Sequence, residues 1–323
     1  MRYRALSSLQ RGGLAGAFAL GILAGCDMPQ PVAAPPRPAP PPADAAAPVP
    51  SQASQAVAAH FARQEASLLA RGMLRTDGGG PDTPFTAAML AENFVRIALF
   101  DEYTEVRGRL VSGPTPSSLR RWEAPVRMRL EFGASVAQAT RQGDRRDVAG
   151  YTARLARLTG HPVSLLPAAA GPEQANFHIL VLDEDERRTA EDRLRRLLPG
   201  IDATSVRIIT DMPLGVSCLV MAFAPAGSHV YSRAVAIVRA ELPDLSRLSC
   251  YHEELAQGLG LPNDSPRARP SLFNDNEEFA LLTRHDELLL RILYDPRLRP
   301  GMREAEARPI VLRLAKELMP GEG

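Results

Sequence analysis

The stretch that decides the fold is residues 249–264, which read SCYHEELAQGLGLPND. Residues four apart on a helix lie about 40° from each other around its axis, so Glu253 and Gln257 share a face. Leu255 and Leu259 lie nearly opposite that face. The stretch therefore predicts a helix that is apolar on the side facing a core and polar on the other side.

The spacing of this stretch resembles the metzincin metalloprotease pattern H-E-x-x-H-x-x-G-x-x-H. In that alignment Glu254 takes the place of the general base, Gly260 that of the turn glycine, and Asp264 that of a final acidic residue. The three histidine ligands of the pattern are replaced by Glu253, Gln257 and Asn263. The resemblance implies descent from a metalloprotease scaffold, with an oxygen donor at each former imidazole position.

A second alignment starts one residue earlier, at His252. It fits the shorter zinc-protease pattern H-E-x-x-H only in its first two positions, because Ala256 stands where the second histidine is required. We therefore favour the longer pattern. His252 is then either a stray ligand or base, or a hydrogen-bonded structural residue of the helix, and we favour the structural role.

Oxygen donors change the metal that such a site would take. Zinc prefers histidine nitrogen and cysteine sulfur, whereas carboxylate and amide oxygens suit Ca²⁺, Mg²⁺ or Mn²⁺. The candidate metal ligands are Glu253, Gln257, Asn263 and Asp264, and Glu254 is the candidate catalytic base. The alternative is that both glutamates lie in the first helical turns after a Ser249 cap, near the positive end of the helix dipole. We expect no cofactor, with a divalent metal as the alternative.

Alternating and periodic apolar residues predict the elements before this helix. We expect two helices, from Ser54 to about Gly72 and from Thr86 to Leu99, and later helices from Arg145 to Leu158 and from Asp183 to Leu198. The expected strands are residues 126–132, 161–166, 176–183, 216–224 and 231–240, the last two as a hairpin. A capping box at Thr283 predicts one further helix.

This order of elements resembles the catalytic domain of zincin metalloproteases. The resemblance implies an α+β fold in which a twisted mixed sheet packs against a long helix and an active-site-type helix. We expect a small helical module at 51–118 and the zincin-like domain at 119–323.

At finer grain, residues from Thr76 to Leu318 resemble an uncharacterised family of bacterial lipoproteins, a domain of unknown function. The resemblance rests on Arg121-Trp122, 125–127, 175–177, 249–264, 270–290 and 293–298. It brings no established reaction with it.

The first residues have the pattern of an export signal. Arg2, Arg4 and Arg11 precede a short apolar run that ends at Leu23-Ala24-Gly25-Cys26, which resembles a bacterial lipobox. The resemblance implies a signal peptide at 1–25 and a lipid on the thiol of Cys26, or, as the alternative, a cleaved signal without lipid. Residues 26–50 are rich in Pro and Ala, which predicts an extended linker.

The two remaining cysteines, Cys218 and Cys250, would form a disulfide in an oxidising compartment, or else remain two buried thiols. The formal net charge of +1 provides no basic surface for nucleic acid. We therefore expect a lipid-anchored protein facing the periplasm, with Asp27 favouring the inner over the outer membrane.

Such a protein would be a degenerate, more likely inactive metallopeptidase-like domain that binds a peptide, a protein or a cell-envelope ligand. An active metal-dependent peptidase with non-histidine ligands is the alternative. The membrane, through the lipid, and that ligand are the expected partners.

Overall fold

In the computed structural model, residues 49–106, 109–274 and 276–320 are described. The predictions for residues 1–48, including the signal peptide, Cys26 and most of the linker, lie outside them. Residues 46–323 form one compact unit. No helix in the described part of the chain is both long enough and apolar enough to cross a membrane.

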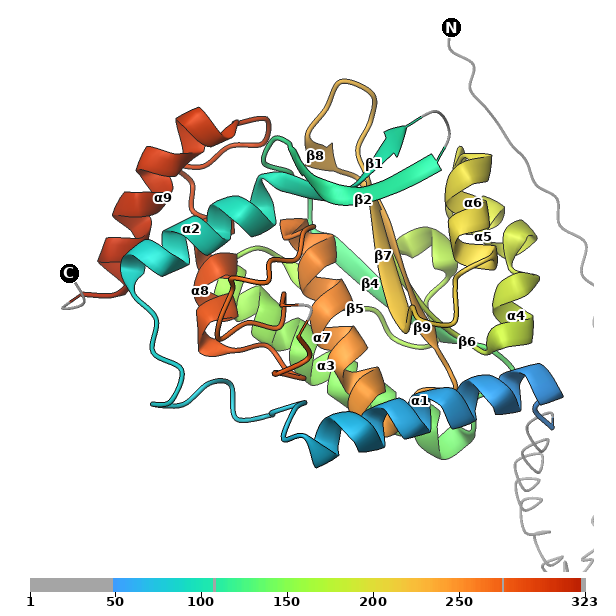
Figure 1. Ribbon diagram of the computed structural model, residues 1–323. Coiled ribbons are helices and arrows are strands. Elements are labelled where there is room, and N and C mark those ends of the chain that lie inside the picture. Colours follow the sequence, from blue (N-terminus) through green and yellow to red (C-terminus); the bar gives the residue numbers. More distant parts are fainter. Residues whose placement is uncertain (1–48, 107–108, 275, 321–323) are drawn as a thin grey trace, which may run out of the picture. The chain divides into compact units, whose positions relative to one another are not determined.

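The centre of this unit is a five-stranded mixed sheet with the order β5-β4-β6-β9-β7 (Figure 1). Four strands are parallel, and the edge strand β7 runs antiparallel to β9. The strands are β4 (Val126–Phe132), β5 (Val163–Leu165), β6 (Phe177–Leu182), β7 (Cys218–Phe223) and β9 (Arg233–Arg239). All five predicted strands are therefore present, and the last two form the predicted hairpin.

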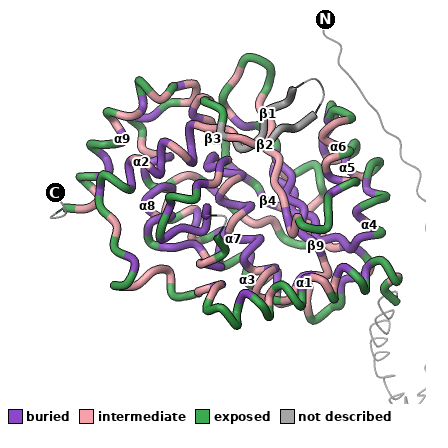
Figure 2. The backbone as a smooth tube through the Cα atoms, in the orientation of Figure 1, coloured by how far each residue is buried: buried purple, intermediate pink, exposed green. Residues whose placement is uncertain are grey.

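Helices cover both faces of the sheet, so its central strands are buried on both sides, as Figure 2 shows in purple. Every residue of β6 is buried, as expected for a parallel strand between two helical layers. One face packs on the short helices α4 (Glu184–Arg188), α5 (Glu191–Leu197) and α6 (Ala203–Thr210). The predicted helix from Asp183 to Leu198 is thus two helices, separated at Thr189 and Ala190.

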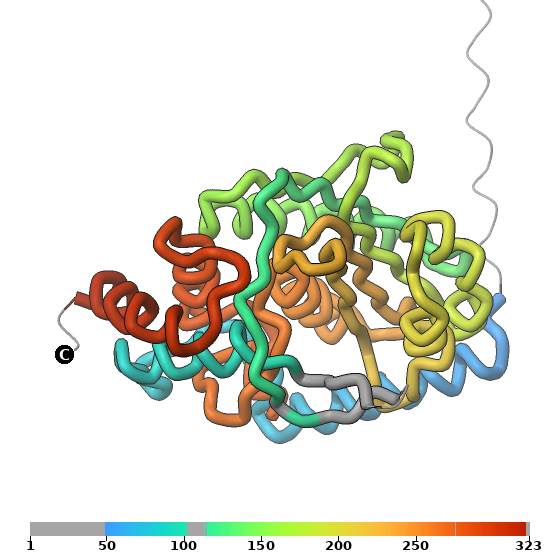
Figure 3. Tube along the Cα trace, turned by 90° about the horizontal axis from the view of Figure 1, so that it is seen from above, coloured from blue at the N-terminus to red at the C-terminus, as the bar shows by residue number. Residues whose placement is uncertain are grey.

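The other face packs on the larger helices, which together hold most of the core. These are α2 (Ala87–Ala98), α3 (Gln138–Thr159), α7 (Asp244–Gly260), α8 (Arg284–Leu293) and α9 (Glu304–Leu318). Viewed from above, α9 and α6 lie at opposite sides of the molecule (Figure 3). Helix α3 starts earlier than predicted, and it ends at Gly160, the predicted left-handed C-cap.

The region 51–118 is not wholly helical, which corrects the prediction of a helical module. After α1 (Gln52–Ala70) and α2 it contains an antiparallel hairpin of β1 (Phe100–Val106) and β2 (Arg109–Pro116). Phe61 of α1 and Phe94 of α2 belong to the same core as the sheet. The two short strands β3 (Arg121–Trp122) and β8 (Val230–Tyr231) pair in parallel outside the main sheet. The prediction of a mixed α and β fold is confirmed.

Candidate functional site

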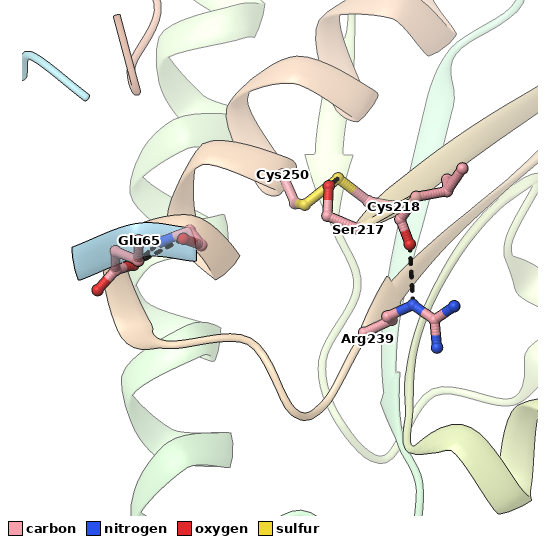
Figure 4. The surroundings of a disulfide bond; sticks show 7 residues. Glu65, Ser217, Cys218, Arg239 and Cys250 are labelled. Atoms are coloured by element: carbon pink, nitrogen blue, oxygen red, sulfur yellow. Dashed lines mark hydrogen bonds between the residues drawn. A yellow bond between two sulfur atoms is a disulfide. The ribbon is translucent and has the colours of Figure 1, made fainter. Parts of the chain in front are cut away.

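Helix α7 begins earlier than its sequence motif suggested. Its N-cap is Pro243 and its first residue is Asp244, so Ser249 lies inside the helix and does not cap it. The cap comes from another helix: the backbone N–H and the hydroxyl of Ser246 donate to Glu65 of α1, at 2.9 and 2.6 Å (Figure 4). A carboxylate is favourable there, because the first turn of a helix has unpaired N–H groups and a positive dipole end. Glu253 and Glu254 lie well beyond that turn.

A disulfide joins α7 to the sheet. Cys250 of α7 is bonded to Cys218 at the start of edge strand β7, and their Cα atoms are 6.0 Å apart (Figure 4). Both residues are buried, with 3% and 8% of their surface exposed. The predicted pairing is therefore present, and it holds one turn of the motif helix against the edge strand.

The two motif glutamates lie beside this disulfide. Ligand atoms of Glu253, Glu254 and Cys218 are all within 4.8 Å of one another. Glu254 is buried and Glu253 is half-buried. The candidate base and one candidate metal ligand thus lie together, but the third atom of the group is a sulfur that no sequence pattern placed there.

The other predicted ligands lie at the end of α7 and bind protein groups. Gln257 donates from Nε2 to Oδ1 of Asp264 at 3.1 Å. Asn263 is buried and donates from Nδ2 to the carbonyl of Arg96 at 2.8 Å, while its backbone N–H donates to the carbonyl of Ile97. These bonds attach the segment after α7 to the C-terminal end of α2. Three residues with metzincin spacing therefore stabilise the chain around the helix end.

Gly260 makes the turn after α7, as the motif predicts. Its φ is +131°, and a Cβ there would lie 2.3 Å from the carbonyl oxygen of Arg120. Gly258 also has a packing role, since a Cβ would lie 2.5 Å from the ring of Phe177 on β6. Its carbonyl accepts a hydrogen bond from Nε1 of Trp122 at 2.8 Å. Glycine at these positions lets α7 lie close to the sheet.

His252 has a structural environment. Its Nδ1 accepts a hydrogen bond from the backbone N–H of Leu282 at 3.0 Å, and its ring stacks on Tyr151 with centroids 4.0 Å apart. Burial, with a smaller contribution from Arg154, lowers the pKa of His252 to about 3. The imidazole is therefore neutral at neutral pH, with its proton on Nε2.

A cavity of about 390 Å³ opens on another side of α7, between its N-terminal half and α3. Its lining includes Asp144, Asp147, Asp244, Arg247 and Tyr251. Asp144, Arg247 and Tyr251 are buried, whereas Asp147 and Asp244 are exposed. Sequence reasoning missed this site, because Asp144 and Arg247 are 103 residues apart and no motif connects them.

The buried part of the cavity lining is a hydrogen-bonded ionic group. Nε of Arg247 donates to both carboxylate oxygens of Asp144, at 3.0 and 2.9 Å, and the hydroxyl of Tyr251 donates to Oδ2 at 2.8 Å. Burial raises the pKa of Asp144, although Arg247 and Tyr251 oppose that effect. Burial and the nearby Asp144 raise the pKa of Tyr251 well above its usual value. Three carboxylates and one guanidinium make the lining net negative.

The comparisons with known proteins agree with this description at the level of family. A family model described as a protein of unknown function (DUF2927) matches residues 87–313. The chain belongs to the DUF2927 family. No curated protein and no solved structure matches it.

The DUF2927 region includes the disulfide, the motif helix and the cavity, whereas α1 with its capping Glu65 precedes it. The runs on which the family resemblance rested contact one another within this region. Arg121 donates to the carbonyl of Leu298 at 2.9 Å, and its neighbour Trp122 donates to α7. Asn176 accepts from the N–H of Arg127 at 2.7 Å. Several residues that mark the DUF2927 family therefore connect the sheet with α7 and the end of α8.

Proposed function

We propose that this protein is a membrane-tethered binding protein of the cell envelope and that its DUF2927 domain is a catalytically degenerate relative of the zincins. Two observations support the descent: a mixed sheet with one antiparallel edge strand, and a motif helix that packs beside that strand and turns at Gly260. The lipid on Cys26 and the periplasmic location come from the sequence pattern alone.

The observation that carries the binding role is the cavity between α3 and α7. A volume of about 390 Å³ lies within the usual range for small-ligand sites, about 300–1,000 Å³. Its buried Asp144 is already neutralised by Arg247, so the exposed Asp147 and Asp244 supply the excess negative charge. A ligand with a positive group, such as the free amine of a peptide or of a cell-wall peptide, fits this lining.

A calorimetric titration of the purified full-length chain with short peptides tests the binding role. Each peptide is used with a free amine and as its acetylated analogue. We expect binding of the free amines only, weakened about tenfold in the Asp147→Asn/Asp244→Asn double variant, since each exposed pair contributes about 0.2–1 kcal/mol. Asp192→Asn on α5, exposed and remote from the cavity, is the control. Equal binding of acetylated and free peptides would refute the proposal.

A metal-dependent peptidase is the second candidate. It is favoured by the grouping of Glu253 and Glu254 with a sulfur atom, and it is opposed by the hydrogen bonds of Gln257 and Asn263 with protein groups. As an enzyme, the protein would need Glu254 to deprotonate a metal-bound water. A chelator-sensitive cleavage activity that Glu254→Gln abolishes would establish it, and its absence in metal-replete protein would exclude it.

A further inference from the structure

The four side chains around the disulfide have the geometry of a second, separate site. On α7, Cys250, Glu253 and Glu254 are spaced i, i+3 and i+4, so they lie on neighbouring positions of one face. Cys218 reaches the same place from β7, and its sulfur is bonded to that of Cys250. Two sulfur atoms and two carboxylates are thus gathered where α7 meets the sheet edge. We propose that reduction of this disulfide converts the group into a Zn²⁺ site with two thiolate and two carboxylate ligands.

The distances need little adjustment. The ligand atoms of Cys218, Glu253 and Glu254 are within 4.8 Å of one another, and Cys250 is already joined to Cys218. In a tetrahedral zinc site with Zn–S of about 2.3 Å and Zn–O of about 2.0–2.2 Å, ligand atoms are about 3.5 Å apart. Side-chain rotations of about 1 Å therefore complete the site without movement of α7 or β7.

The chemistry explains why the site depends on reduction. In the disulfide each sulfur is bonded to the other, so no thiolate is available as a metal ligand. A dithiol reductant supplies two electrons and two protons: its own sulfurs become a disulfide, and Cys218 and Cys250 become thiols. Zn²⁺ then replaces the two thiol protons. The product has two thiolates, two carboxylates and one Zn²⁺, which is the same net charge of about −2 as a four-cysteine zinc site.

Burial favours a cation at this place once the thiolates form. Cys250, Cys218 and Glu254 are 3%, 8% and 4% exposed, and Glu253 is half-buried beside them. Several negative groups in a poorly solvated position repel each other strongly, and a divalent cation removes that repulsion. The same site in its oxidised state lacks two of its ligands.

The experiment is a Zn²⁺ titration of the full-length protein, in competition with a chromogenic chelator, before and after treatment with dithiothreitol and its removal under nitrogen. We expect one equivalent of Zn²⁺ to bind the reduced protein at least about 100-fold more tightly than the oxidised protein. Co²⁺ in place of Zn²⁺ should give a thiolate-to-metal charge-transfer band in the near ultraviolet, which Cys218→Ser/Cys250→Ser abolishes. Glu253→Gln and Glu254→Gln should each weaken Zn²⁺ binding at least about tenfold, since even outer partners of metal ligands contribute about 10–100-fold.

Two controls keep the result interpretable. Glu287→Gln, on α8 and away from the disulfide, should bind as the wild type does. The unfolding temperature of the reduced protein should rise with Zn²⁺, and that of the oxidised protein should not. The proposal is overturned by equal Zn²⁺ affinity in both redox states, by full affinity in both glutamate variants, or by a reduced protein that Zn²⁺ does not stabilise.

Discussion

Arg247 of α7 holds the carboxylate of Asp144 on α3 with Nε at 3.0 and 2.9 Å from its two oxygens. The same guanidinium donates to the carbonyl of Leu242 and to Asp244, so each of its nitrogens has an acceptor. Asp144 also accepts from Tyr251. This buried group fixes the distance between the two helices and forms the inner lining of the cavity between them.

Removal of Arg247 should therefore be costly. In Arg247→Met, Asp144 would remain buried without its cation, and breaking a buried pair in this way costs about 3–5 kcal/mol. We expect that decrease in the free energy of unfolding in urea, and less than about 0.5 kcal/mol for Arg146→Met, an exposed arginine on α3. Arg247→Met combined with Asp144→Asn should recover part of the loss. A decrease below about 1 kcal/mol in the single variant would contradict this account.

The disulfide should make its own contribution to stability. It closes a loop over a sequence separation of 32 residues, for which the chain-entropy model gives about 3–4 kcal/mol. Cys218→Ser/Cys250→Ser should lower the free energy of unfolding by that amount, measured in urea with chelator present. Ser217→Ala, next to the bond, is the matched control and should have less than about 0.5 kcal/mol of effect. An unchanged stability in the double variant would show that packing alone holds α7 on β7.

His252 should make stability depend on pH. Its folded pKa of about 3 lies below the usual value of 6.5, so the unfolded chain binds the proton more readily. The contribution of the neutral, buried imidazole is fully present above pH 6.5 and is lost as pH falls from 6.5 towards 3, with a limiting slope of about 1.4 kcal/mol per pH unit. His252→Asn keeps an acceptor for Leu282 without titrating. The difference in urea stability between wild type and this variant should change with pH only below about 6.5, and a constant difference from pH 4 to 8 would refute the assignment.

Asn263 distinguishes a structural residue from a metal ligand. Asn263→Ala leaves the buried carbonyl of Arg96 without its side-chain donor, which should cost about 1–3 kcal/mol. The loss should be the same with chelator and with added Ca²⁺, Mg²⁺, Mn²⁺ or Zn²⁺, measured by thermal and urea unfolding. Asp264→Asn, the next residue, keeps an acceptor for Gln257 and should lose less. A loss seen only with metal present would identify Asn263 as a ligand.

The lipid anchor can be tested on Cys26 alone. We expect the full-length protein to incorporate radiolabelled palmitate and to sediment with membranes, and Cys26→Ser to do neither. Cys218→Ser/Cys250→Ser should keep both properties, because those thiols are bonded to each other. Membrane sedimentation of Cys26→Ser without label would show that another contact holds the protein there.

Local sequence patterns were sufficient for most of the secondary structure near the site. The alternation of 126–132, the buried run before Asp183, and the cap at Thr283 each depend on neighbouring residues, and each corresponds to an observed strand or helix start. The hairpin of β1 and β2, the break between α4 and α5, and the start of α7 at Asp244 were missed or misplaced. The cap of α7 could not be read locally, because Glu65 supplies it from a different helix.

By itself the sequence determined the class of fold, the presence of an amphipathic helix at 249–264, the turn at Gly260 and the pairing of the only two cysteines outside the N-terminal region. It did so because periodicity, glycine conformation and thiol chemistry are properties of short segments or of single residues. Only the tertiary structure decided which side chains meet. The packing of α7 between β7 and α3 places Glu253 and Glu254 beside Cys218, directs Asn263 to α2, and brings Asp144 to Arg247, since contacts between residues far apart in the chain depend on how whole elements pack.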